Sequence, residues 1–283
     1  MEKRLLLGTA SAIAMASVAF GVPAYAGNIV LTGHDNDFHY DGFGSKTTGP
    51  GGALAAELSF VRNGSTLPVL TFDAGTELTS SLTALGISFT NINPSTAIDP
   101  AVFDHSKYSA FAVASVTSCG GCDNAPGDIA NIAADKTAIA AFFDAGGGIL
   151  GLAAATDANG YAYVPDSAGN PTPIYASSGF VDTALGTALG IPAVNGDETH
   201  NIFDEPGTGG VSSLYGVTER YGSDGPAVTL ALSGGKITCT GTHCKITSTS
   251  PVPEPGTLSL FGAGLIGLAA MTRRRRKAGL STG

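Results

Sequence analysis

Short apolar runs alternate with segments of helical hydrophobic spacing over the first half of the chain. Residues 28–31 are Asn-Ile-Val-Leu, and Gly33 ends this run, which is typical of a strand buried on both faces. Apolar residues three or four positions apart predict helices over residues 51–61, 76–85 and 129–145. Further strands are expected at residues 67–72, 87–89, 108–116 and 149–153. This alternation predicts an α/β domain, a three-layer sandwich with a mainly parallel sheet.

The pattern becomes irregular after Asp157, where prolines, glycines and serines interrupt the apolar runs. A helix is expected over residues 180–189. Later strands are expected at residues 211–218, 227–232 and 236–239. The sequence therefore predicts an irregular, β-rich C-terminal part of the same domain.

The N-terminal segment has the features of a secretory signal peptide. Lys3 and Arg4 precede an apolar stretch that extends to about residue 20, and Ala24-Tyr25-Ala26 provides a small-residue cleavage site. An N-terminal core helix is the alternative, but helix caps are absent and small residues dominate. We expect residues 1–26 to be removed by signal peptidase and residues 27–247 to form the exported domain.

The C-terminal segment consists of three parts in a fixed order. Pro253, Glu254 and Pro255 lie in a linker (248–256), an apolar helix is expected over residues 257–271, and arginines dominate the basic tail at 272–283. This order resembles the PEP-CTERM sorting signal of Gram-negative bacteria. The resemblance implies cleavage near the Pro-Glu-Pro motif by an exosortase-type membrane protease and delivery to the cell surface or extracellular matrix.

The apolar helix supports the same topology on physical grounds. Its 15 residues would span about 22 Å, less than the ~30 Å hydrocarbon core of a bilayer. The basic cluster behind it favours a cytoplasmic C-terminus, so the helix would anchor the chain in the inner membrane with the domain outside. A permanent anchor would give the same topology and differs only in that the tail is kept.

Charge narrows the choice of partners. The 283 residues include 14 basic and 23 acidic side chains, a formal charge of −9. Residues 27–247 alone hold 7 basic and 21 acidic side chains, a charge of −14. Because such a surface repels phosphate backbones, no nucleic-acid partner is expected. The 43% hydrophobic content also excludes a disordered chain.

The four cysteines form two local pairs. Cys119 and Cys122 are separated by two glycines, and Cys239 and Cys244 flank an expected hairpin turn. In an exported protein these pairs predict two short-loop disulfides, Cys119–Cys122 and Cys239–Cys244. A C-x-x-C redox centre and a four-thiolate zinc site are the alternatives.

Residues 146–154, Gly-Gly-Gly-Ile-Leu-Gly-Leu-Ala-Ala, resemble the helix–strand–turn of class I glutamine-amidotransferase-like folds, including the trehalose-utilisation-type branch. The resemblance implies a flavodoxin-like or amidotransferase-like sheet, and a cysteine or histidine on the turn after the strand. Here that turn position falls on Ala153 or Ala154. Because alanine cannot attack a carbonyl carbon, no catalytic residue is expected by this route.

Polar side chains are densest directly after the first expected strand, at His34, Asp35, Asp37 and His39. In an open parallel sheet ligands bind outside such strand ends. The carboxylates suit Ca²⁺, and the imidazoles suit another divalent cation such as a transition metal. The spacing is not that of an EF-hand. A turn in which these side chains cap backbone groups is the alternative.

A second polar cluster contains Asp197, Glu198 and His200. We expect it to meet the first cluster over the sheet edge, with Asp157 joining from the centre. For His200 the alternative role is a cap at a strand end. Such a pocket would bind a cation or sugar hydroxyls, and nearby tyrosines would stack on a sugar ring. These tyrosines are Tyr161, Tyr163 and Tyr175.

The sequence thus predicts a non-enzymatic, surface-sorted protein of the extracellular polymer matrix. Its pocket would bind a cation or an extracellular polysaccharide. The alternative is a surface hydrolase or other carbohydrate-active enzyme that uses His and Asp as an acid/base pair. A third hypothesis is a purely structural matrix protein. The chain has no P-loop, no H-E-x-x-H and no G-x-S-x-G motif.

Overall fold

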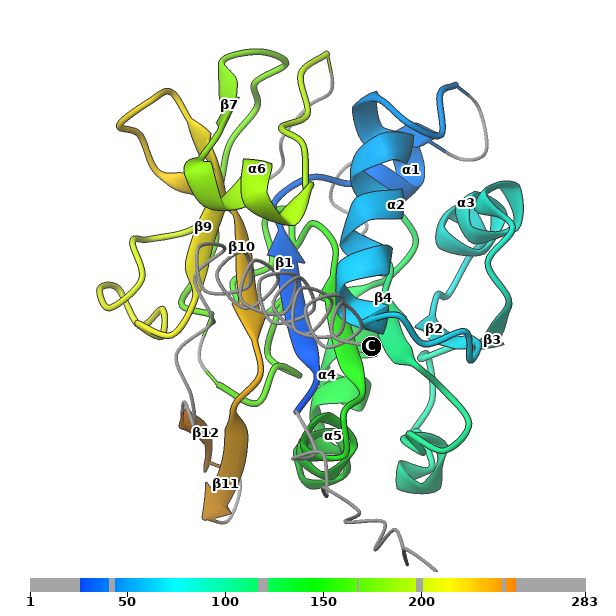
Figure 1. Cartoon of the computed structure of the whole chain (residues 1–283). Helices are drawn as coiled ribbons and strands as arrows, with labels where there is room; N and C mark the ends of the chain where they lie inside the picture. The colour runs from blue at the N-terminus through cyan, green and yellow to red at the C-terminus, as the bar shows by residue number, and fades with distance from the viewer. Residues whose placement is uncertain are drawn as a thin grey trace, which may run out of the picture.

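A computed structural model describes residues 26–40, 44–116, 122–166, 168–196, 201–240 and 243–247. Its centre is an eight-stranded sheet in the order β3-β2-β4-β5-β1-β10-β9-β7 (Figure 1). In chain order these strands are β1 (Asn28–Thr32), β2 (Val69–Phe72), β3 (Phe89–Ile92), β4 (Ala110–Val113), β5 (Gly148–Gly151), β7 (Phe180–Asp182), β9 (Gly216–Tyr221) and β10 (Ala227–Ser233).

Two small sheets and several helices accompany this sheet. The small sheets pair β6 (Thr172–Pro173) with β8 (Asn201–Ile202), and β11 (Lys236–Thr240) with β12 (His243–Thr247). The helices are α1 (Asn36–Tyr40), α2 (Gly49–Arg62), α3 (Glu77–Leu85), α4 (Pro126–Ala133), α5 (Lys136–Asp144) and α6 (Ala184–Leu189), with a short 3-10 helix η1 (Pro100–Val102).

The strand directions confirm the α/β class with a mainly parallel sheet. β3, β2, β4, β5 and β1 are parallel, and β10, β9 and β7 extend the sheet through antiparallel pairs. A flavodoxin-like sheet has the strand order 2-1-3-4-5. Here β1 lies between β5 and the antiparallel β10. The flavodoxin-like assignment is therefore not confirmed.

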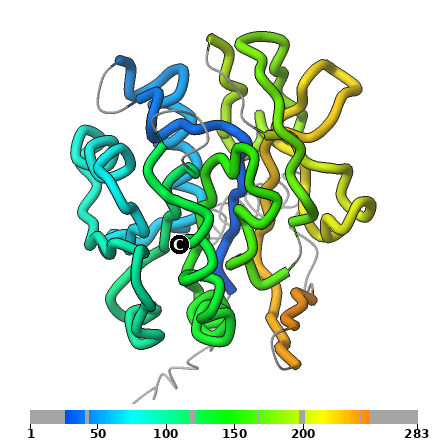
Figure 2. Tube along the Cα trace, turned by 180° about the vertical axis from the view of Figure 1, so that it is seen from behind, coloured from blue at the N-terminus to red at the C-terminus, as the bar shows by residue number. Residues whose placement is uncertain are grey.

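Helices cover both faces of the sheet. One core packs Leu54 and Leu58 of α2 and Leu82 of α3 against Val30 of β1. The other core packs the side chains of α4 and α5 against Ile29, Leu31 and their neighbours. Figure 1 shows α2 in front of the sheet, and Figure 2, seen from behind, brings the green segment of α5 to the front. The sheet is the middle of three layers.

Several predicted elements have different bounds. The strand expected at residues 211–218 is found at Gly216–Tyr221, because residues 212–215 form a turn and irregular chain. Three further elements also differ. The predicted strand 87–89 begins at residue 89, because Gly86 caps α3 with a φ of 73° and Ile87 N–H donates to Leu82 O. The predicted helix 180–189 begins at 184, because Thr183 Oγ1 accepts from Gly186 N–H as an N-cap. The residues before it pair with β9 instead. The predicted helix 129–145 is divided into α4 and α5 at residues 134–135.

Glycine is required where backbones approach the ends of β1 and β5. A Cβ atom on Gly33 would lie 1.7 Å from the carbonyl oxygen of Asn201, and one on Gly148 would lie 2.1 Å from that of Val61. Neither oxygen can move without displacing its own segment. These contacts hold α2 and the segment that begins at Asn201 tightly against the sheet.

The C-terminal hairpin of the domain is closed by a disulfide. Cys239 and Cys244 face each other across β11 and β12, and their sulfur atoms are 2.01 Å apart. Cys122 is also disulfide-bonded, and Cys119 lies outside the described residues. Within the described ranges, no helix combines the length and the apolar character that crossing a bilayer requires. The expected helix 257–271 lies outside those ranges.

Candidate functional site

The residues after β1 form a buried polar network at the carboxyl end of the sheet. His34 Nε2 lies 3.0 Å from Glu219 Oε2, and neither side chain is more than 2% exposed. The same carboxylate accepts hydrogen bonds from Thr229 Oγ1 (2.8 Å) and from Val194 N–H (2.8 Å). The pair therefore joins β1, β9, β10 and the segment after α6.

Two further carboxyl groups are buried beside it. Asp37 pairs with Ser115, whose N–H and Oγ lie 2.8 Å and 2.5 Å from its carboxyl oxygens. Burial raises the pKa of Asp37 to about 7, although the bonds to Ser115 act in the opposite direction. Asn36 Nδ2 donates to both carboxyl oxygens of Glu57 at 3.3 Å. Burial also raises the pKa of Glu57 to about 7, opposed by the charge of His34.

The fourth pair of this network, His39 with Asp35, is the one most accessible to solvent. His39 Nε2 lies 3.3 Å from Asp35 Oδ2 across one turn of α1, and the His39 side chain is 32% exposed while that of Asp35 is buried. The sulfur of Cys122 lies 3.6 Å from the same Asp35 oxygen. The carboxylate thus orients an imidazole that reaches the surface.

The network does not gather the predicted ligands around one point. The side chain of His34 pairs with Glu219, that of Asp37 pairs with Ser115, and that of Asp35 pairs with His39. Within the described part of the chain, no group of three or more His, Cys, Asp or Glu side chains is arranged to hold a metal ion. A cation site that includes Asp197 and His200 remains a prediction, because both residues lie outside the described ranges.

The residue that follows the second cluster, Asn201, lies beside the end of β1, whereas the cluster itself lies outside the described residues. Asn201 follows the residues outside the described range, and its N–H donates to Gly33 O at 3.3 Å. Its Oδ1 accepts from Ala154 N–H (2.8 Å) and from Tyr161 OH (3.2 Å). Asp157 lies elsewhere, against α4, where its carboxylate accepts from Asn159 N–H.

Two of the tyrosines expected to stack on a sugar ring are buried instead. Tyr161 and Tyr163 are 4% and 0% exposed and belong to the core on the α4–α5 face. Tyr161 OH donates to Thr32 O at 2.7 Å, which fixes the ring against β1. Only Tyr175, which is 66% exposed, presents its ring to solvent. The prediction was wrong for Tyr161 and Tyr163 as exposed stacking platforms, because the loop folds back over the sheet.

The turn after β5 has unusual backbone geometry. Ala155 has a φ of 47°, a left-handed value that residues other than glycine and asparagine rarely adopt. A sharp turn after a strand is where α/β enzymes of several kinds place a nucleophile. Here the strained residue and its two predecessors, Ala153 and Ala154, are alanines. Their methyl groups supply no nucleophile.

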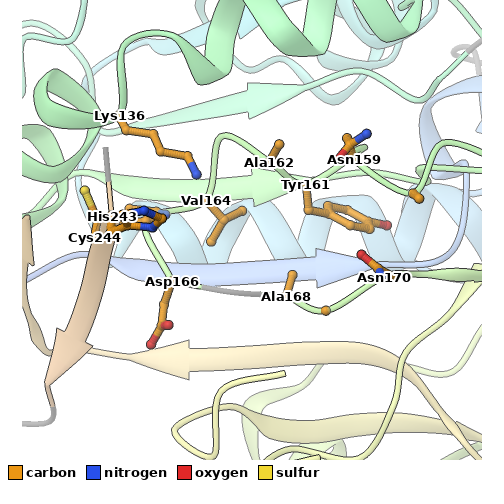
Figure 3. A pocket seen from close by; sticks show the side chains of 13 residues that line it. Lys136, Asn159, Tyr161, Ala162, Val164, Asp166, Ala168, Asn170, His243 and Cys244 are labelled. Carbon is orange, nitrogen blue, oxygen red and sulfur yellow. The ribbon is translucent and has the colours of Figure 1, made fainter. Parts of the chain in front are cut away.

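Three cavities that described residues line lie away from the buried network. One of about 280 Å³ and one of about 530 Å³ adjoin each other between α4, the start of α5, the segment after β5 and β12. Both are lined by Lys136, Asn159, Ala162 and His243. In Figure 3, Lys136 and His243 occupy one end of the smaller cavity, and Asn159, Asn170 and Tyr161 occupy the other. A third cavity, of about 350 Å³, lies beside Glu205 and Asp224.

One family model matches the chain. Residues 251–276 match the PEP-CTERM protein-sorting motif. Comparison with curated proteins and with solved structures finds no significant match, so the resemblance of residues 146–154 to amidotransferase-like folds has no support from relatives. The motif indicates an exported protein that an exosortase, a membrane protease, processes and sorts to the cell surface through a transient membrane anchor.

Proposed function

We propose that the processed chain is a non-catalytic protein of the extracellular polymer matrix and that residues 27–247 bind carbohydrate of that matrix. The observation that carries the proposal is the sorting motif at residues 251–276. The body supports it in two ways. Its acidic surface suits a soluble protein among secreted polymers. Residues 153–155, where the turn after β5 would present a nucleophile, are alanines and offer no group for covalent catalysis.

The buried network is consistent with a structural role. His34, Asp37, Glu57 and Glu219 are shielded from solvent and bonded to partners on other elements. A substrate could reach them only after these bonds were broken. Their contribution is to tie β1 to α2, β4 and β9 at the end of the sheet.

The Pro-Glu-Pro motif provides the direct test of sorting. Replacing Pro253, Glu254 and Pro255 together by alanine is expected to block processing, because the motif is the feature by which an exosortase would select the chain. The variant should accumulate in the inner-membrane fraction, and the amount released to the surface should fall at least about tenfold, measured by immunoblot of cell fractions. The control is Ser248→Ala with Ser250→Ala in the same linker. Equal surface release of the motif variant would contradict the assignment.

A second candidate function is favoured by the His39–Asp35 pair. A buried carboxylate behind a half-exposed imidazole is an arrangement that supports general acid/base catalysis. A surface hydrolase acting on matrix polysaccharide would use His39 as the acid/base and Asp35 to orient it. We propose this only as the alternative.

The alternative is tested by hydrolysis. If it holds, purified protein releases reducing ends from its own matrix polysaccharide, and His39→Gln lowers that rate by about 100-fold or more. Lys107→Ala is the control. The Lys107 side chain is exposed and distant from His39 in the sequence, so this substitution should leave the rate of hydrolysis unchanged. The non-catalytic proposal predicts no reducing-end release by the wild-type protein above a heat-treated sample.

A further inference from the structure

We propose that the two adjoining cavities form one groove that binds a neutral oligosaccharide segment. The inference rests on the proposed function and assigns its binding site. The groove lies on the α4–α5 side of the sheet and shares four lining residues between its two parts: Lys136, Asn159, Ala162 and His243. Cavities in which small ligands bind are roughly 300–1,000 Å³ in size. Two connected cavities of about 280 and 530 Å³ suit successive units of a chain.

Polar side chains along the groove are available to a ligand. Within the described residues, the side chains of Lys136, Asn159, Asn170 and His243 take part in no hydrogen bond or ion pair. An asparagine amide offers two donors and an acceptor, and a neutral imidazole offers one of each. Sugar hydroxyls both donate and accept hydrogen bonds. These four side chains therefore match a row of sugar hydroxyls better than they match a purely cationic or purely anionic ligand.

The floor of the groove is apolar and fixed. Val164 is buried, and Ala162 lies beside it between the two polar ends (Figure 3). Tyr161 also lines the cavity, and the bond from its OH to Thr32 O holds the ring in place. The C–H face of a pyranose ring packs on exposed apolar groups, which Pro126, Ala130 and Ala133 of α4 supply in the larger cavity. Because the floor is already ordered, little conformational entropy is lost on binding.

The hairpin that carries His243 is anchored on both strands. The Cys239–Cys244 disulfide closes it. Ile237 N–H donates to Asp144 Oδ1 at 2.7 Å, and Ile246 N–H donates to Asp166 Oδ2 at 3.3 Å. The hairpin thus forms a rigid wall that is bound to α5 and to the segment after β5.

The negative charges in the groove and on the domain disfavour binding of an acidic polysaccharide. Lys136 is the one lysine or arginine among the described lining residues of the groove, whereas Asp157 and Asp166 both line it. The domain as a whole carries −14. Uronate or sulfate groups would therefore be repelled both at a distance and within the groove. Hexoses and N-acetylhexosamines are the sugars that fit.

The test is isothermal titration of the processed protein with tetrasaccharides of glucose, mannose, galactose and N-acetylglucosamine, with tetragalacturonate as the anionic probe. At least one neutral tetrasaccharide is expected to bind. Asn159→Ala combined with His243→Ala should weaken its affinity about tenfold or more, since each lost hydrogen bond removes part of the binding free energy. The thermal midpoint should stay unchanged, because neither side chain holds the fold together.

Lys236→Ala and Lys245→Ala are the matched controls on the same hairpin, outside the groove, and should bind like the wild type. Absence of binding by all four neutral sugars, binding of tetragalacturonate alone, or unchanged affinity of the double variant would each overturn the proposal. None of these results would alter surface sorting, which depends on residues 253–255. Unchanged affinity of the double variant would reject the groove alone, whereas absence of carbohydrate binding by the wild type would also reject the carbohydrate-binding part of the proposed function.

Discussion

Replacing Glu219 by alanine is expected to lower the free energy of unfolding by about 3–5 kcal/mol. The side chain is buried and accepts from Val194 N–H and Thr229 Oγ1 while it pairs with His34. Its removal leaves the buried imidazole without its carboxylate and the amide without its acceptor. Unpartnered buried polar groups are costly. Chemical denaturation of wild type and variant would measure the loss.

Glu205→Ala is the matched control. Glu205 pairs with Arg220 on the same strand as Glu219, but its side chain is 48% exposed. An exposed ion pair contributes roughly 0–1 kcal/mol, so the control should lose little stability. A loss below about 1 kcal/mol for Glu219→Ala would show that the His34–Glu219 pair does not hold the end of the sheet together.

The second large effect is a fall in stability as the pH rises from about 4 to about 7. In the folded protein the pKa values of Asp37 and Glu57 are raised by burial to about 7. In the unfolded chain both groups ionise near pH 4. Between these values the folded state binds more protons than the unfolded state, so the free energy of unfolding decreases with increasing pH. Below pH 4 both states are protonated, and this contribution is fully present.

A third carboxyl group adds to the same trend. Burial and the neighbouring Asp123 raise the pKa of Asp73, at the end of β2, to about 7. For Asp37 or Glu57 alone, a shift of this size corresponds to roughly 3–4 kcal/mol. Thermal unfolding at pH 5 and pH 8 would show the higher midpoint at pH 5. Asp37→Asn removes one titrating group and should flatten the profile, whereas a wild-type profile that rises with pH would contradict the account.

Much of the fold follows from hydrophobic periodicity. The residues of β1, β2, β4 and β5 are short apolar runs, and α2 and α3 carry clear apolar stripes. The hydrophobic pattern could not predict the order of the strands in the sheet. A buried strand such as β1 has the same apolar sequence whether its neighbour is parallel or antiparallel. Its position between β5 and β10 depends on contacts across more than 100 residues. Local caps at Gly86 and Thr183 account for the shifted starts of β3 and α6.

The candidate site was predictable in part. The position of His34, Asp35, Asp37 and His39 after β1 follows from the sequence, but their separate partners do not. Glu57 could have been found, since it lies three residues after Leu54 and four before Val61 on the buried stripe of α2. No sequence pattern marked Glu219 as buried. It and its neighbour Thr218 are both buried on β9, so the usual alternation of buried and exposed residues along a strand is lost there. The groove depends on how the segment after β5 folds back, which no local pattern specifies.

The central claim is that the chain leaves the cell and loses both of its ends. The most direct measurement is cell fractionation followed by intact-mass analysis of the protein found at the surface. We predict a product that begins at Gly27, ends within or close to Pro253, Glu254 and Pro255, and contains no free thiol. A full-length chain in the cytosol, with its four cysteines reduced, would contradict the account.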